Sequence, residues 1–131
     1  MAIQYRKGAV RDLATLRFEE GLSITAESIE FNVLGIGHEF WIAVQGDLVI
    51  GFTVLADENN DGFRILRLEV APSRKNMGVG TAMLKAIMEA YPRCGLSVVP
   101  SGGAEVFYEG LGFRWVSRWE MRKGPPFVPA V

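Results

Sequence analysis

The sequence has few of the residues that form cross-links, bind metals or enter membranes. Its one cysteine, Cys94, cannot make an internal disulfide, and with the single histidine it cannot form a Cys/His zinc site. No apolar run approaches the roughly 20 residues of a membrane helix, and no apolar core of a signal peptide follows the first charged residues. We therefore expect a cytoplasmic protein that uses no metal and has no membrane partner.

The chain also lacks an excess of charge of either sign. Its net charge is −1, with 22% charged and 49% hydrophobic residues, which gives no electrostatic argument for nucleic acid as a partner. A length of 131 residues suits one domain, 1–131, with a substantial core. The segment 124–131 contains three prolines and cannot continue a strand or helix, so it either packs on a second subunit in a homodimer or lies loose.

Apolar patterns and turn residues predict that strands and helices alternate along the chain. The runs 40–45 and 48–55 are almost continuously apolar, as in a central sheet covered on both faces, and Gly46-Asp47 between them suits a type II′ hairpin. From Gly80 to Tyr91 apolar residues recur at helical spacing, and Pro92 ends that helix. We expect strands at 3–6, 40–45, 48–55, 63–70, 96–99, 113–117 and 119–122, and helices at 11–20, 25–34, 80–91 and around 104–108.

Polar residues between these elements predict caps and turns. Thr25, with Ser28 as a rival, is expected to cap the second helix, and Ser101 to cap the last one. The segment 57–62 resembles the start of a calcium-binding loop but lacks the glutamate that calcium needs at loop position 12. We expect a solvated turn there, because its residue types are those of turns.

The most informative stretch is 70–81, where a strand-like run leads into a glycine-containing loop and then into a helix. The free N–H groups and the dipole at a helix N-terminus favour phosphate, and Gly78 and Gly80 allow a ligand to approach the backbone. Met83 stands where a dinucleotide fingerprint needs its third glycine, and the lysine and hydroxyl of a Walker A loop are absent. Spacing alone therefore leaves two readings open, a phosphate loop and a tight turn with a solvated charge pair.

Two segments resemble the hallmarks of one enzyme family. Val70-Ala71-Pro72 followed by Lys75-Asn76-Met77-Gly78-Val79-Gly80 resembles the acetyl-CoA loop of the GNAT N-acetyltransferase superfamily, Val-x-Pro and then Gln/Arg-x-x-Gly-x-Gly/Ala. Residues 104–113, Ala-Glu-Val-Phe-Tyr-Glu-Gly-Leu-Gly-Phe, resemble a second segment of that family. The resemblance implies an α/β (α+β) fold, with a mixed, mostly antiparallel sheet splayed between its fourth and fifth strands and flanked by four helices. It implies that acetyl-CoA lies in the opening.

The resemblance also implies the residues that contact acetyl-CoA. Backbone groups of the strand before the loop would pair with the pantetheine arm, and the loop would hold the pyrophosphate. Lys75 stands where the family usually has Gln or Arg, and Ser101 stands where many relatives have Asn. The implied contacts are Leu68, Val70, Arg74, Lys75, Asn76, Met77, Gly78, Val79, Gly80, Thr81, Ser101 and Tyr108.

Catalytic roles follow from the same resemblance and from acid–base chemistry. Tyr108 takes the place of the general acid that protonates the leaving thiolate, although a tyrosine in this position also suits a core. For the general base we consider Glu69 and Glu39, with His38 as a weaker alternative, because Arg64 occupies the place where relatives often carry the base. A solvated or ion-paired role for Glu69 stays open. Strand alternation predicts that it shares a face with Ile65 and Arg67, opposite Leu68 and Val70.

The predicted function is an N-acetyltransferase that moves the acetyl group from acetyl-CoA to a primary amine by direct attack in a ternary complex. The acceptor is a small molecule or a peptide. Trp41, Trp115 and Trp119 either line its pocket or belong to the core, and Glu19 and Glu20 either meet a cationic amine or are solvated. A CoA-binding sensor without turnover, and transfer from a longer acyl-CoA, remain the alternatives.

Overall fold

The strands of the molecule form one mixed sheet, described by a computed structural model over residues 2–24, 26–58 and 62–124. The order across the sheet is β1-β3-β4-β5-β6-β8-β7, and β2 pairs with β4. The strands are β1 (Ile3–Lys7), β2 (Arg17–Phe18), β3 (Glu39–Gln45), β4 (Leu48–Asp57), β5 (Gly62–Val70), β6 (Gly95–Val98), β7 (Arg114–Trp115) and β8 (Met121–Lys123).

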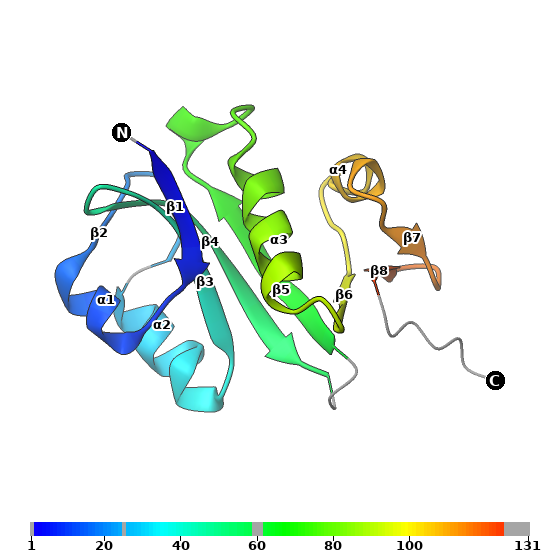
Figure 1. The fold of residues 1–131 in the computed structure, drawn as a ribbon, viewed down its shortest axis with the longest axis horizontal. Coiled ribbons are helices and arrows are strands. Elements are labelled where there is room, and N and C mark those ends of the chain that lie inside the picture. Colours follow the sequence, from blue (N-terminus) through cyan, green and yellow to red (C-terminus); the bar gives the residue numbers. More distant parts are fainter. Residues whose placement is uncertain (1, 25, 59–61, 125–131) are drawn as a thin grey trace.

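Four α-helices cover the sheet in the described part of the chain, two on each face. They are α1 (Val10–Thr15), α2 (Ala26–Asn32), α3 (Val79–Ala90) and α4 (Glu105–Gly110), with short 3-10 turns at Leu34–Ile36 and Pro72–Arg74. Figure 1 shows α3 over the middle of the sheet, with the α1–α2 pair on the side of β1 and β3 and α4 beyond β6.

Each face of the sheet has its own apolar core. On one face Met83, Leu84 and Ile87 of α3 pack with Tyr108 of α4 and with Ile65 of β5. On the other face the α1–α2 side packs over β3 and β4, with residues such as Ile29, Phe40 and Phe52. The nearly continuous apolar runs of β3 and β4 arise because both faces of these strands are covered.

Most neighbouring strands are antiparallel, as predicted. The pairs β1–β3, β3–β4, β4–β5, β6–β8 and β7–β8 are antiparallel, whereas β5–β6 and β2–β4 are parallel. The β5–β6 pair is parallel because α3 forms the crossover between the two strands. The β3–β4 hairpin turns at Gly46-Asp47, and Gly46 has the positive φ of 66° that a type II′ turn needs at its first central position.

The first helix is shorter than the predicted 11–20. It ends at Thr15, and Leu16 is already extended, with φ −100° and ψ 149°. The chain then forms β2 beside β4, and the N–H of Arg17 donates to the carbonyl of Asp47 at 2.9 Å. Leu13, Leu16 and Phe18 still pack in one core, so burial satisfies the apolar pattern without continuing the helix.

Several other boundaries differ from the predictions. The second helix stops at Asn32 rather than residue 34, and the closing strands β7 and β8 are shorter than predicted. Ser28 lies inside α2, and Thr25 lies outside the described residues. The predicted cap at Ser101 is wrong, because α4 follows Ala104 and has no side-chain cap hydrogen bond. Residues 59–61 of the predicted polar turn and 125–131 of the tail also lie outside the described residues.

Strand β5 separates from β6 halfway along its length, which confirms the predicted splay. Its pairing with β4 continues from Phe63 to Val70, but its pairing with β6 stops at Ile65. A β-bulge lies at the same place, since Val54 pairs with Arg67, Leu55 pairs with Ile65, and Leu66 has no partner in β4. We call the gap between Leu66–Val70 and the β6–α4 segment the opening.

The bulge also corrects the predicted alternation of β5. Ile65 was expected on the face of Arg67 and Glu69, but it belongs to the α3 core, against which Leu68 and Val70 also pack. One extra residue in the strand shifts the side-chain alternation by one position. Arg67 and Glu69 therefore lie on the opposite face, where the Arg67 guanidinium carbon lies 5.5 Å from the centre of the Phe52 ring.

Candidate functional site

The opening contains two adjoining cavities. The deep cavity has a volume of about 280 Å³ and is lined by Ile65, Leu66, Arg67, Leu68, Glu69, Val98, Ser101, Ala104 and Tyr108. The loop cavity has a volume of about 670 Å³ and is lined by Leu68, Val70, Arg74, Lys75, Asn76, Gly78, Val79, Gly80, Thr81, Ala104 and Phe107. Leu68 and Ala104 line both. Because successive β5 residues face opposite sides, the deep cavity reaches both faces of the sheet.

The loop cavity surrounds the backbone of the predicted phosphate loop. Asn76 has a φ of 64° and Gly78, the N-cap of α3, has a φ of 78°. The N–H groups from Asn76 to Thr81 make no hydrogen bond to a described residue, whereas Ala82 begins the helical pattern by donating to the carbonyl of Gly78 at 3.0 Å. Free N–H groups at a helix N-terminus suit an anion such as a phosphate.

The two basic residues of this loop differ. Arg74 donates from Nε to a carboxylate oxygen of Glu19 at 3.2 Å and from Nη1 to the side-chain oxygen of Gln45 at 2.7 Å. Ser73 donates to the same carboxylate at 2.9 Å, so Glu19 offsets the charge of Arg74 and fixes the loop. Lys75 is exposed and has no ion pair within the part of the chain that the structure describes.

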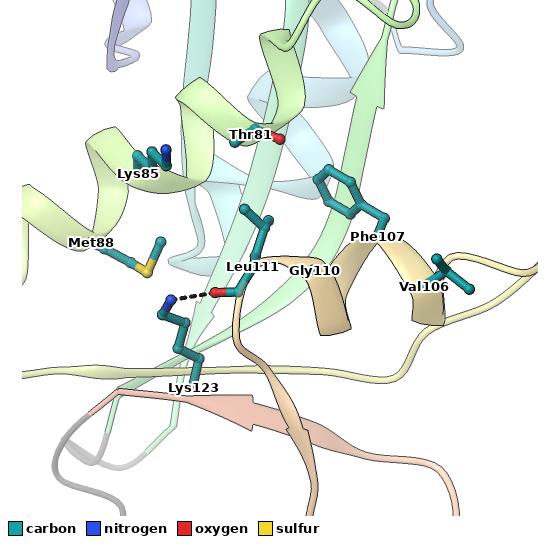
Figure 2. Close-up of a pocket in the computed structure, with 8 residues that line it drawn as sticks. All are labelled: Thr81, Lys85, Met88, Val106, Phe107, Gly110, Leu111 and Lys123. Carbon is teal, nitrogen blue, oxygen red and sulfur yellow. Dashed lines mark hydrogen bonds between the residues drawn. The ribbon is translucent and has the colours of Figure 1, made fainter.

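A third cavity continues the loop cavity between α3 and α4. It has a volume of about 460 Å³ and shares Thr81 and Phe107 with the loop cavity. Figure 2 shows Lys85 and Met88 on the α3 side and Leu111 on the α4 side, and the Lys123 ammonium donates to the Leu111 carbonyl. We call this space the helix cavity. The three cavities form one row from Tyr108 to Lys85.

Tyr108 belongs to the core and also lines the deep cavity. It is 5% exposed and its ring packs edge-to-face on Phe107 and Phe113, with centroids 5.1 and 5.2 Å away. It also lines the deep cavity, and its hydroxyl makes no hydrogen bond to a described residue. Burial raises the pKa of Tyr108 to about 12. The phenol therefore remains protonated at neutral pH and can donate a proton into the cavity.

Glu69 lines the same cavity but is held by hydrogen bonds. One of its carboxylate oxygens accepts from the Ser23 N–H at 2.8 Å, and the other accepts from the Ser23 hydroxyl at 2.5 Å and from Arg67 at 3.0 Å. Burial raises the pKa of Glu69, but the donors Ser23 and Arg67 outweigh it, so the net pKa lies below the ordinary value. Glu69 is thus an ion-paired carboxylate that takes up a proton poorly.

Glu39 lies in another part of the fold. Its carboxylate accepts from the Trp41 indole at 3.0 Å and the Tyr91 hydroxyl at 2.8 Å, and it pairs with Lys7 at 3.4 Å. Tyr91 is the C-cap of α3, at the end of the helix remote from the glycine loop. Neither Glu39 nor His38 lines the deep cavity or the loop cavity, so the structure does not bring them together with Tyr108.

The remaining predicted residues divide between cavity and surface. Ser101 lines the deep cavity, whereas Met77 is 62% exposed and lines neither the deep nor the loop cavity. Trp41 is buried in the core, while Trp115 and Trp119 are exposed. Sequence reasoning missed the role of Ser23, because nothing in the sequence links it to Glu69, 46 positions away.

Two absences apply to the described residues only. They contain no group of three or more histidine, cysteine, aspartate or glutamate side chains placed to hold a metal ion. Among them, no helix has the length and apolar character needed to cross a membrane.

The glycine loop and the open sheet agree with what comparison with known proteins finds. Residues 37–115 match the family model for the acetyltransferase (GNAT) domain. The fold is similar to that of a GNAT-family acetyltransferase from Staphylococcus aureus Mu50, with a TM-score of 0.66 and 18% identity over 93% of this chain and 98% of the other. No curated protein matches the chain in sequence.

Two further structures with this fold hold a CoA compound. The GNAT-family acetyltransferase of Brucella melitensis, solved with acetyl-CoA, has a TM-score of 0.68 and 15% identity over 99% of this chain and 91% of the other. The Bacillus subtilis N-acetyltransferase YlbP, solved with coenzyme A, has a TM-score of 0.66 and 14% identity over 95% and 97%. At such identities these structures support the fold, whereas the family model covers more than half of the sequence: the chain belongs to the GNAT acetyltransferase family.

Proposed function

We propose that this protein is an acetyl-CoA-dependent N-acetyltransferase that works by direct transfer in a ternary complex. The observation that carries the proposal is the opening beside β5, which reaches both faces of the sheet and has the glycine loop at one end and Tyr108 within it. Two cosubstrates can enter such an opening from opposite faces and meet at β5. The single cysteine supports a reducing cytoplasm as its location.

The row of cavities fits the parts of acetyl-CoA. Free N–H groups from Asn76 to Thr81 would hold the pyrophosphate, with Lys75 adding positive charge. Open backbone of β5 at Leu68 and Val70 would pair with the pantetheine arm, since no strand of the described residues occupies that edge. The helix cavity would take the nucleotide end, where Phe107 offers an aromatic surface and Lys85 a positive charge.

Tyr108 and the β5 backbone carry the chemistry in this proposal. The backbone of β5 beyond Ile65 faces the opening and has no strand partner there in the described part of the chain, so an N–H there can hold the thioester oxygen as charge develops on it. The amine nitrogen forms a bond to the carbonyl carbon, the carbon–sulfur bond breaks, and Tyr108 gives its proton to the sulfur. Its high pKa keeps the proton available before the reaction.

The amine must also lose a proton, because an amine with a pKa near 10 is mostly protonated at neutral pH. Glu69 is the carboxylate that lines the deep cavity, but its hydrogen bonds and lowered pKa make direct proton uptake unfavourable. We propose that Glu69 orders a water that relays the proton to bulk solvent. Glu39 is not part of this proposal, because its carboxylate is bound to Trp41, Tyr91 and Lys7 outside the cavities.

Thiol release from acetyl-CoA with a panel of amines tests the proposal. Tyr108→Phe is expected to lower kcat about 10²- to 10⁴-fold while the Kd for CoA changes little, because only the proton donor is removed. Phe113→Leu is the matched control, since it alters the packing on the Tyr108 ring and keeps the hydroxyl. Equal kcat for Tyr108→Phe and the unmodified protein would exclude Tyr108 as the acid.

The involvement of Glu69 in hydrogen bonds favours one second candidate, a CoA-binding sensor without turnover. In that case isothermal titration detects CoA binding, but no amine of any class releases thiol. Amine-dependent thiol release excludes the sensor. A longer acyl donor is distinguished from acetyl by comparing kcat/KM for acetyl-CoA with that for longer acyl-CoA thioesters.

A further inference from the structure

The face of β5 opposite the glycine loop presents one fixed guanidinium group. Arg67 lines the deep cavity, and its guanidinium lies over the Phe52 ring. One of its nitrogens, Nη2, donates to the Ser23 hydroxyl and, at 3.0 Å, to Glu69. Two side chains and an aromatic face therefore hold this group in one orientation. An arginine that only interacts with solvent does not need a fixed orientation of its guanidinium group.

In the cluster of Ser23, Arg67 and Glu69, the groups that remain available to a ligand are hydrogen-bond donors. Glu69 accepts three hydrogen bonds, two from Ser23 and one from Arg67, so its charge is well compensated. Arg67 has five N–H groups, and those on Nε and Nη1 have no acceptor among the described residues. Its side chain is 44% exposed, so a ligand can reach it. The complementary ligand group is a carboxylate, the planar anion that guanidinium binds best in proteins.

We propose that the acceptor is an amino acid, whose carboxylate binds Arg67 while its amino group reaches the thioester beside Leu68 and Tyr108. This inference rests on the proposed acetyltransferase function. The deep cavity, about 280 Å³, is small and suits a molecule of amino-acid size. The amino nitrogen bonds to the acetyl carbon and the carbon–sulfur bond breaks. Before the attack the ordered water passes the ammonium proton on to bulk solvent. Tyr108 then protonates the sulfur and regains the second nitrogen proton through solvent, which gives an N-acetyl amino acid and free CoA thiol.

Ser23 and Glu69 act as positioning residues in this arrangement, because they fix the guanidinium rather than touch the acceptor carboxylate. Their loss would loosen Arg67 without removing its charge. The proposal therefore separates charge, supplied by Arg67, from orientation, supplied by Ser23 and Glu69.

The test compares each amino acid with its own amide, in which the carboxylate is neutral and the amino group is kept. Thiol release is measured with acetyl-CoA and the twenty amino acids, each paired with its amide. For the preferred amino acid, we expect a kcat/KM about 10- to 100-fold above that of its amide, the range of a hydrogen-bonded charge pair. Arg67→Gln should bring this ratio close to one, and Arg67→Lys should restore part of it.

Arg118→Gln is the matched control, because it removes the same charge from an exposed arginine beside Trp119 that lines none of the three cavities. CoA binding and thermal melting of Arg67→Gln show whether the variant is folded. If amides react as well as amino acids, or if the ratio survives Arg67→Gln in a folded protein, the acceptor assignment is overturned while acetyl transfer stands. If no amine releases thiol, the acetyltransferase function and this assignment are both overturned.

Discussion

The two edges of strand β5 provide an instructive comparison. On one edge β4 pairs with it from Phe63 to Val70 around the bulged Leu66, and on the other edge β6 pairs with it only from Gly62 to Ile65. The same residues of β5 therefore have a paired backbone edge toward β4 and an unpaired backbone edge toward the opening. β-propensity is equal for both edges, so it cannot explain the difference. The bulge at Leu66 lies where the pairing with β6 ends, and the candidate site lies beside it.

The largest effect is expected at the first residue pair between β5 and β6, Gly62 and Gly95. Gly62 has a φ of 142°, and a Cβ there would lie 2.2 Å from the Gly95 carbonyl oxygen. Gly62→Ala should therefore force the paired ends apart and lower the free energy of unfolding by about 3 kcal/mol. Urea unfolding measures the change.

Gly110→Ala serves as the control for that variant. An added Cβ at Gly110 meets nothing within 4 Å, and the residue ends α4 with an ordinary φ. Alanine favours helices by about 1 kcal/mol over glycine, so this variant should be neutral or slightly stabilising. Equal unfolding free energies for the two variants would show that the close approach of β5 and β6 carries no strain.

The next effect is expected at Asp12 in the first turn of α1, away from the opening. Asp12 is 5% exposed, accepts from Arg6 at 2.7 and 2.9 Å, and accepts from the Ala9 N–H at 2.7 Å. Asp12→Asn should lower the free energy of unfolding by about 2 kcal/mol, because it leaves the Arg6 charge without its partner. Arg11→Gln on the same helix is the control, since that residue is exposed and should change stability by less than about 0.5 kcal/mol.

Asp12 also gives the stability a defined pH dependence. Its hydrogen bond with Arg6, opposed by burial and aided by the Ala9 N–H, holds the pKa of this carboxyl below its ordinary value. The folded state thus binds this proton less readily than the unfolded state. The stabilisation is complete above the ordinary aspartate pKa of about 4 and is lost as the pH falls through the lowered pKa. Acid unfolding of Asp12→Asn should lack this contribution.

Sequence reasoning predicted the parts of the site that depend on local chemistry. The turn at Gly78 before α3 follows from local turn and helix signals that need no distant partner, whereas the role of Tyr108 was implied by the family resemblance and stays a prediction. The bulge at Leu66 could not be predicted, because the run 63–70 is compatible with a regular strand, and only the register with β4 shows the extra residue. The Ser23–Glu69 contact likewise depends on tertiary packing.

The ends of helices also depend on tertiary packing where local signals are weak. The apolar residues Leu13, Leu16 and Phe18 match a helix by spacing, yet pairing with β4 turned the last two into extended chain. Local signals predicted α3 well because Gly78 and Pro92 bound it on both sides. The elements α2 and β7 were predicted too long although glycine stands beside each of them, Gly35 after the predicted helix and Gly112 before the predicted strand.

A smaller effect distinguishes a glycine in the opening from one outside it. Gly78 and Gly37 have φ values of 78° and 83°, and an added Cβ meets nothing within 4 Å at either. Alanine at each should lower stability by a similar amount, about 1 kcal/mol. Only Gly78→Ala is expected to weaken CoA binding, by about tenfold or more in isothermal titration. If both variants bind CoA with the same Kd, the glycine loop does not hold the ligand.

The smallest effect is expected at the exposed edge beyond β6. Trp119 is 64% exposed, so Trp119→Ser should change the free energy of unfolding by less than about 0.5 kcal/mol. Trp41→Ser, in the buried core at 6% exposure, should cost several times more. Thermal melting of the two variants decides whether the two tryptophans differ as their burial indicates.

Because β5 and β6 pair only near Gly62 and Gly95, this short paired segment can act as a hinge between the two parts of the sheet. About 16 Å of β5 extends past the last paired residue, at roughly 3.3 Å per residue. A rotation of β5 by about 5° relative to β6 would shift Val70 by more than 1 Å relative to α4, while the paired ends of the two strands barely move. The width of the opening, and with it the size of the molecule that fits, can therefore be changed by side chains near Gly62 and Gly95 that contact neither of the two proposed substrates.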